Sequence, residues 1–202
     1  MSRAGFFPTT PLWEVRVNES ETDEAALVRQ ILAGDRDAFE RLVSRHHRRV
    51  FGIAYRMTGS AADAEDLCQE TFLRVFRSLG RYDGRLPFVP WLRKIACNVA
   101  LNQLRDRAPE RRLMRAAEPQ DDEIGAPGAG PEATAASRER QARIERAISA
   151  LPDAQRLAFT LKYVEELSTD EIAETMDAPR NTVKSWLLRA REHLRETLAD
   201  EL

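Results

Sequence analysis

The sequence predicts an all-α protein: two small helical domains joined by a flexible linker, the second a four-helix domain containing a helix-turn-helix. Three observations support this class. Apolar residues recur at helical spacing through the long segments, and runs of β-branched residues are few. The ten prolines and nine glycines gather in a few stretches between those segments. With 202 residues, the chain is long enough for two domains.

Charge and composition narrow the classes of partner. The formal net charge is -2, so any contact with nucleic acid must come from local basic faces. No segment approaches the roughly 18 to 20 consecutive apolar residues of a membrane span, and the N-terminus lacks the pattern of a signal peptide. Cys68 and Cys97 are isolated, without CxxC spacing, which favours buried reduced thiols over a zinc site or a redox pair. We therefore expect a cytoplasmic protein with no membrane insertion, no cofactor and no metal.

The first half of the chain predicts a tail and a helical domain. We expect residues 1–22 to be a flexible N-terminal tail and residues 23–107 to form the first domain. Its first helix spans 23–33 and ends at Gly34, and its inward residues are Ala26, Leu27, Ile31 and Leu32. Asp35 can cap a second helix that runs to about Met57. The centre of that helix, SRHHRRV, is interpreted as a solvated basic face, because its His pair has no acidic partner at ligand spacing.

A third helix begins at Ser60 with Asp63 as its capping partner and ends at Gly80. Its expected buried stripe is Ala64, Leu67, Cys68, Thr71, Phe72, Val75 and Phe76. Another face carries Asp63, Asp66, Gln69 and Glu70. Acid–base catalysis by these carboxylates would need a shifted carboxyl in a dry cleft, and the sequence supplies no partner for one. We therefore assign no catalytic residue.

A fourth helix is predicted over 90–105, after a polar turn at 81–85. Its expected inward residues are Leu92, Ile95, Ala96, Val99 and Leu104. Its other faces offer hydrogen-bond donors from Arg93, Lys94, Asn98, Asn102, Gln103 and Arg105. Basic and amide side chains beside an aromatic residue suit single-stranded or distorted nucleic acid. Trp91 by itself is more typical of a core anchor than of a base-stacking platform.

Residues 108–137 change character and predict a linker, since Pro, Gly, Ala and acidic residues dominate there. The second domain spans 138–202. One helix in it is stopped by Pro152, and Asp153 is expected to cap the next.

The domain closes with a helix-turn-helix. Ser168, followed three residues later by Glu171, has the pattern of a capping box for a helix that reaches Met176. The last helix starts near Pro179, and its apolar stripe is Val183, Trp186, Leu187, Ala190 and Leu194. The first of the two helices is acidic and the second is basic, as expected of a helix that enters the major groove of DNA.

Three motifs together identify a family resemblance. They are DAEDLCQETFLRVF at 63–76, PFVPWLRKIACNVALNQLR at 87–105 and LSTDEIAETMDAPRNTVKSWLLRAR at 167–191. In this order across a linker they resemble bacterial RNA polymerase sigma factors of the extracytoplasmic-function (ECF) group of the sigma-70 family. The resemblance covers roughly 24–107 and 138–198. It implies a region 2-like domain for core polymerase and the -10 element, and a region 4-like domain for the -35 element.

The resemblance also implies a function and partners. The chain is expected to be a non-enzymatic initiation factor for a stress or envelope response. Its expected partners are promoter DNA, the clamp region of the largest subunits of core RNA polymerase, and an anti-sigma factor.

Individual residues match contact positions of the family. The expected contacts to core polymerase are Asp63, Asp66, Gln69 and Glu70. The expected contacts to the -10 element are Tyr82, Arg85, Trp91, Arg93, Lys94, Asn98 and Asn102. The expected contacts to the -35 element are Arg180, Asn181, Thr182, Lys184, Ser185 and Arg189. Two departures stand out: the family often has Gly where this chain has Asp177, and usually a basic residue where it has Trp186.

Other functions predict features that the sequence lacks. A stand-alone helix-turn-helix regulator with an N-terminal sensing domain needs a ligand pocket or a dimer helix within 24–107. An enzyme needs a convergent acid–base or metal set. An anti-sigma-type interaction protein would not need both DNA-reading segments.

Overall fold

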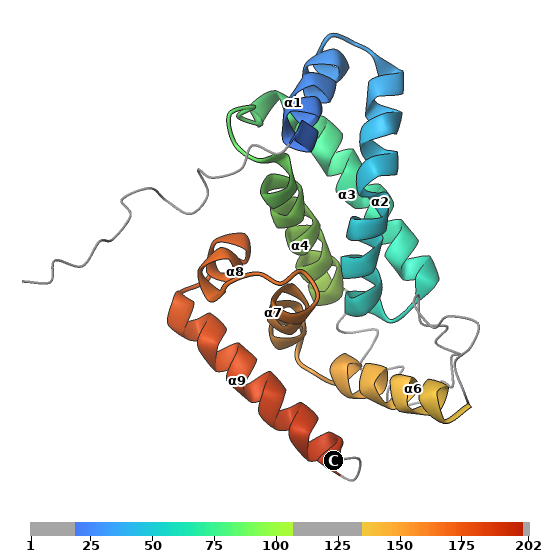
Figure 1. The fold of residues 1–202 in the computed structure, drawn as a ribbon, viewed down its shortest axis with the longest axis vertical. Coiled ribbons are helices and arrows are strands. Elements are labelled where there is room, and N and C mark those ends of the chain that lie inside the picture. The colour runs from blue at the N-terminus through green and yellow to red at the C-terminus, as the bar shows by residue number, and fades with distance from the viewer. Residues whose placement is uncertain (1–18, 107–134, 200–202) are drawn as a thin grey trace, which may run out of the picture.

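The computed structural model describes residues 19–106 and 135–199, and all regular elements in these ranges are helical (Figure 1). The first half contains α1 (Glu19–Leu32), α2 (Arg36–Thr58), α3 (Ala61–Ser78), the 3-10 helix η1 (Leu79–Arg81) and α4 (Phe88–Asp106). The second half contains α6 (Ala135–Ser149), α7 (Asp153–Tyr163), α8 (Thr169–Thr175) and α9 (Arg180–Thr197). The all-α class and the four-helix second half are confirmed. The expected tail and linker lie mostly outside the described residues.

Local capping fixes where α2 and α3 begin. The Asp35 carboxylate accepts a 3.1 Å hydrogen bond from the backbone N–H of Ala38, and the Ser60 hydroxyl accepts one of 3.3 Å from the N–H of Asp63. Gly59 ends α2 in a left-handed conformation, at φ 74°. Both predicted starts are therefore confirmed, whereas α1 begins at Glu19 rather than at Asp23.

The core of the first half forms where α2 packs against α1, α3 and α4. Two residues expected inside are instead exposed: Leu32 by 59% and Phe76 by 54%. Helix α1 buries Leu27, Val28 and Ile31, and Leu32 falls just past that stripe. The ring of Phe76 lies at the margin, edge-on to Phe39 with centroids 5.1 Å apart.

The interpretation of the His pair as a solvated face is wrong for His46, which is buried. Its Nε2 lies 2.8 Å from Oε1 of Glu24, an equally buried carboxylate of α1, and its ring packs against Phe88 of α4. His46 stands four residues after Leu42 and four before Val50, so helical geometry places it within the apolar stripe of α2. The close approach of the two groups offsets part of the cost of burying them, although Oε2 of Glu24 has no hydrogen-bond partner among the described residues.

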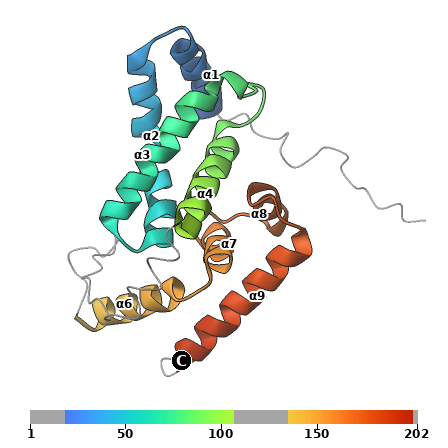
Figure 2. The same cartoon turned by 180° about the vertical axis from the view of Figure 1, so that it is seen from behind.

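The two halves pack against each other through α7, which contacts α2 and α4, while α8 contacts α4. Seen from either side, α7 lies between α4 and α9 (Figure 2). The buried Arg156 of α7 donates a 2.7 Å hydrogen bond to the carbonyl of Met57 at the end of α2. This bond satisfies a carbonyl that the helix leaves unpaired and ties the halves together.

The start of α7 differs from the prediction. Pro152 occupies the N-cap position, and Asp153 is the first helical residue. The Asp153 carboxylate accepts a 2.8 Å hydrogen bond from Arg156 instead of capping the helix. No helix in the described residues is both long and apolar enough to cross a membrane.

Candidate nucleic-acid interface

Helix α4 presents a polar stripe to solvent. Lys94, Asn98 and Asn102 are all exposed, and their spacing of four residues places them on one face. Leu92, Ala96 and Val99 are buried on the inner side, as expected. The stripe combines one cation with two amide groups, which can bind phosphate oxygens and base edges.

An aromatic cluster supports the loop before α4. The ring of Trp91 lies 5.1 Å from Tyr82 and 5.5 Å from Phe88, measured between centroids, and Trp91 is half-buried. The Tyr82 hydroxyl donates to the backbone carbonyl of Leu86 and so closes the loop. These contacts, and the packing of Trp91 against the core, agree with its interpretation as a core anchor.

Arg85 lies at the exposed tip of this loop. It donates hydrogen bonds of 2.9 and 2.7 Å to the two carboxylate oxygens of Asp83. These bonds to Arg85 hold the pKa of Asp83 at about 2, below its ordinary 3.8. The pair orients the Arg85 guanidinium while leaving it accessible to an anion.

Arg93 is buried, so it is not on the exposed face of α4 with Lys94, Asn98 and Asn102 as expected. Its side chain is only 10% exposed, and its Nε lies 3.4 Å from Oε2 of Glu165, in the loop after α7. The same carboxylate oxygen is 3.5 Å from Nε of Arg49 on α2. Because α4 is covered by α2 and α3 on one side and by α7 and α8 on another, Arg93 falls in the contact between the halves. We call Arg49, Arg93 and Glu165 the interdomain ion cluster; the sequence analysis missed Arg49 and Glu165.

Helix α3 carries the polar face assigned to polymerase. Asp66 and Gln69 are exposed, whereas Asp63 and Glu70 are half-buried. Glu70 pairs with Arg74 one turn later, at 2.6 Å. These four residues follow one another along the solvent side of the helix, so they can form one continuous contact.

The helix-turn-helix is formed as predicted. The Ser168 hydroxyl accepts a 3.2 Å bond from the Glu171 N–H, and the Glu171 carboxylate accepts a 2.8 Å bond from the Ser168 N–H. These bonds from Ser168 lower the pKa of Glu171. In the turn, Asp177 adopts φ 49°, the left-handed conformation that Asp tolerates better than most residues.

Helix α9 separates an inner and an outer face. Val183, Leu187 and Ala190 are buried. Most of the residues assigned to DNA lie on the exposed side: Arg180, Asn181, Lys184, Ser185 and Arg189. Thr182 is half-buried, and Arg180 is paired with Asp170 of α8 at 2.9 Å.

Trp186 lies between the buried and the exposed face of α9. It is partly buried and packs against the core of the molecule. Trp186 therefore contributes to packing, at a position where the resemblance led us to expect a basic residue.

Both cysteines lie in the interior of the protein, as predicted. Cys68 and Cys97 are buried and free, and burial raises the pKa of each thiol to about 12. Neither is a nucleophile in this state, because the thiolate is the reactive form.

Two family models match the chain, and each corresponds to one half of the fold. "Sigma-70 region 2" matches residues 42–110, which include α3 and α4. "Sigma-70, region 4" matches residues 141–194, which include α8 and nearly all of α9.

Curated relatives match over most of the chain. The "ECF RNA polymerase sigma factor SigW" of Bacillus subtilis is 34% identical over 178 residues, covering 86% of this chain and 95% of that protein. The "ECF RNA polymerase sigma-E factor" of Escherichia coli is 37% identical over 183 residues, covering 87% and 94%.

Solved structures share the fold. The sigma factor RpoE in complex with the anti-sigma factor NepR, from Bartonella quintana, aligns with a TM-score of 0.63 at 21% identity, covering 81% of this chain and 98% of that one. CnrH in complex with the cytosolic domain of CnrY gives a TM-score of 0.60 at 23% identity, covering 89% and 99%.

Proposed function

The chain belongs to the ECF group of the sigma-70 family, and on that premise we propose how its surfaces divide the work of promoter recognition. A sigma factor binds core RNA polymerase and directs transcription initiation from specific promoters; it is not an enzyme. In our proposal, the solvent side of α3 binds polymerase, α4 with its preceding loop binds the -10 element, and α9 binds the -35 element. Because sigma factors act on RNA polymerase in the cytoplasm, we expect this chain to act there.

The observation that carries this assignment is the separation of exposed polar faces from buried ones. Lys94, Asn98 and Asn102 on α4 point to solvent while the opposite face is packed. Lys184 and Arg189 on α9 do the same. Exposed donors on a rigid helix can meet DNA without breaking the core, and phosphate attraction then adds to base contacts.

The interdomain contact implies a change of shape on promoter binding. The -10 and -35 elements lie about 25 base pairs apart, roughly 85 Å at 3.4 Å per base pair. Helix α4 contacts α8, and α8 packs on α9, so in this arrangement the two proposed DNA-binding helices lie too close together to reach both elements at once. We infer that the halves separate when the chain joins polymerase and promoter.

This closed arrangement also suggests how the factor is held inactive. In the closed form, Arg93 is withdrawn from DNA by Glu165. An anti-sigma factor that bridges both halves would favour this state by mass action, because it would bind the closed chain more tightly than the open one. One similar fold comes from a complex of a sigma factor with an anti-sigma factor, and in our proposal release from such a partner serves a stress or envelope response.

Separate variants test the assignment of the three surfaces. Lys184→Ala with Arg189→Ala should weaken binding to a -35 duplex while leaving affinity for core polymerase unchanged. Asp66→Ala with Gln69→Ala should do the reverse. Arg191→Ala is the matched control, because Arg191 is an exposed cation of α9 outside the assigned set. Loss of both activities in either double variant, with folding intact, would contradict the division of surfaces.

The alternative of a stand-alone regulator is not favoured, because the first half matches the sigma region 2 model rather than a sensing domain.

A further inference from the structure

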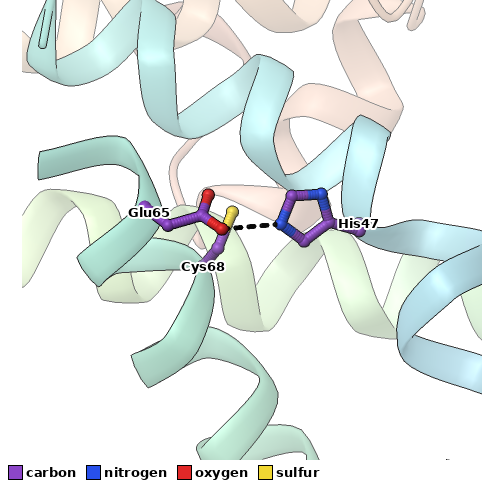
Figure 3. Close-up of side chains that lie close together, drawn as sticks. All are labelled: His47, Glu65 and Cys68. Carbon is purple, nitrogen blue, oxygen red and sulfur yellow. Dashed lines mark hydrogen bonds and ion pairs between the residues drawn. The ribbon is translucent and has the colours of Figure 1, made fainter. Parts of the chain in front are cut away.

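Three side chains with different donor atoms meet between α2 and α3 (Figure 3). His47 of α2 faces Glu65 and Cys68 of α3, and its Nε2 is 3.3 Å from Oε1 of Glu65. One ligand atom of each residue lies within 4.8 Å of the other two. Glu65 and Cys68 are three residues apart on one helix, so they share a face. The packing of α2 on α3 then brings the imidazole to them.

We propose that His47, Glu65 and Cys68 bind a divalent transition-metal ion of the zinc type. Imidazole nitrogen, carboxylate oxygen and thiolate sulfur are the three ligand kinds that zinc takes in proteins. The sulfur selects against magnesium and calcium, which prefer oxygen ligands alone. This site is unrelated to the DNA-binding faces and goes beyond the proposed function.

The spacing of the three groups fits a tetrahedral ion after a small contraction. Ligand bonds of about 2.0–2.3 Å place tetrahedral ligand atoms about 3.3–3.8 Å apart. The His47–Glu65 distance already meets this range, and the widest separation must close by about 1 Å. Rotation about side-chain bonds can supply that movement without shifting either helix.

The three residues differ in their exposure to solvent, which would let an ion enter the site. Cys68 is buried and fixed in the core, whereas the side chains of His47 and Glu65 are 41% and 50% exposed. The sulfur therefore anchors the ion, and the two outer ligands can close on it from the solvent side. This side leaves a fourth position for water or for a partner's side chain. A bound cation also deprotonates a coordinating thiol, which supplies the thiolate.

The neighbouring histidine is not equivalent. His46 is on a different side of α2, where it pairs with Glu24 and its ring packs against Phe88. The ring of His47 instead stacks on Phe51, with centroids 6.0 Å apart. An ion on His47 would join α2 to α3 close to Asp66, in the face assigned to polymerase, so metal loading should stiffen that face.

Cobalt and zinc titrations of the reduced, tag-free full-length chain test the site. Cobalt(II) should bind with one-to-one stoichiometry and give the near-ultraviolet charge-transfer band of a cobalt–thiolate bond, and zinc should displace it. Cys68→Ser should abolish the band, and His47→Gln should weaken zinc binding by about 10-fold or more. Cys97→Ser is the matched control: this cysteine is equally buried on α4, outside the cluster, and its loss should leave the band intact.

Several results would overturn the proposal. One is the absence of a thiolate band in the folded wild-type chain at millimolar cobalt. Another is a band that survives Cys68→Ser, or that disappears only with Cys97→Ser. Circular dichroism checks the folding of every variant. Should Cys68→Ser fail to fold, His47→Gln and Glu65→Gln at the half-exposed positions decide the matter, and unchanged zinc affinity in both refutes the site.

Discussion

Replacing Glu165 with Gln should open the contact between the two halves of the chain. The substitution keeps the shape of the side chain but removes the charge that faces Arg49 and Arg93 at 3.5 and 3.4 Å. Breaking a fully buried ion pair costs about 3–5 kcal/mol. The value here is smaller, because Arg49 is 43% exposed and an exposed pair contributes at most about 1 kcal/mol. We expect the closed form to lose about 2 kcal/mol, which raises the opening constant by about 30-fold.

Energy transfer between two dyes measures this opening. Arg77→Cys on α3 and Arg195→Cys on α9 offer exposed attachment points, and the native cysteines are buried. The Glu165→Gln chain should show lower transfer efficiency than the parent, and adding salt should narrow the difference. Glu166→Gln is the control, since Glu166 is the adjacent, exposed carboxylate. Equal efficiencies for Glu165→Gln and its parent, or an equal drop for Glu166→Gln, would refute the reasoning.

Three further changes test other contacts. Ser168→Ala removes the capping box of α8 and should lower the free energy of unfolding, measured by urea denaturation, by about 1 kcal/mol. Ser185→Ala, at an exposed position of α9, is the control. An equal loss of stability in both variants would contradict a specific role for the cap. His46→Ala leaves the buried Glu24 without its partner and should cost about 3 kcal/mol, whereas His47→Ala at the half-exposed neighbour should cost less than 1 kcal/mol; the reverse order would overturn the burial argument. The pKa of Asp83 is lowered from 3.8 to about 2 in the folded chain, so the stability that Asp83 contributes is present above pH 4 and is lost as the pH falls through about 2. NMR titration should show this low pKa, and Arg85→Gln should return the pKa toward 3.8. An unshifted pKa of Asp83 in the wild-type chain would exclude the pairing.

The elements that sequence could predict are those whose signals are local. Asp35, Ser60 and the Ser168–Glu171 capping box fix helix starts through bonds within four residues, so the pattern alone was enough. The left-handed Asp177 is also a local matter of backbone preference.

The residues whose surroundings were predicted wrongly or missed are those that contact distant segments of the chain. Arg93 shares the buried side of α4 with Cys97 and Ala100, as its helical spacing allows, but the partners of its charge, Glu165 and the neighbouring Arg49, lie on other elements. His46 could have been found, since it stands within the apolar stripe of α2, but its partner Glu24 lies on another helix. The meeting of His47 with Cys68 depends on how α2 packs on α3, which no helical period encodes.

Run-off transcription with core RNA polymerase tests the central claim most directly. Core enzyme alone should give no promoter-specific transcript, and adding the chain should produce one of defined length from a promoter with matching -10 and -35 elements. Lys184→Ala with Arg189→Ala should reduce that transcript, and Arg191→Ala should not. A well-folded chain that binds core polymerase but yields no specific transcript from any member of a randomised promoter library would contradict the account.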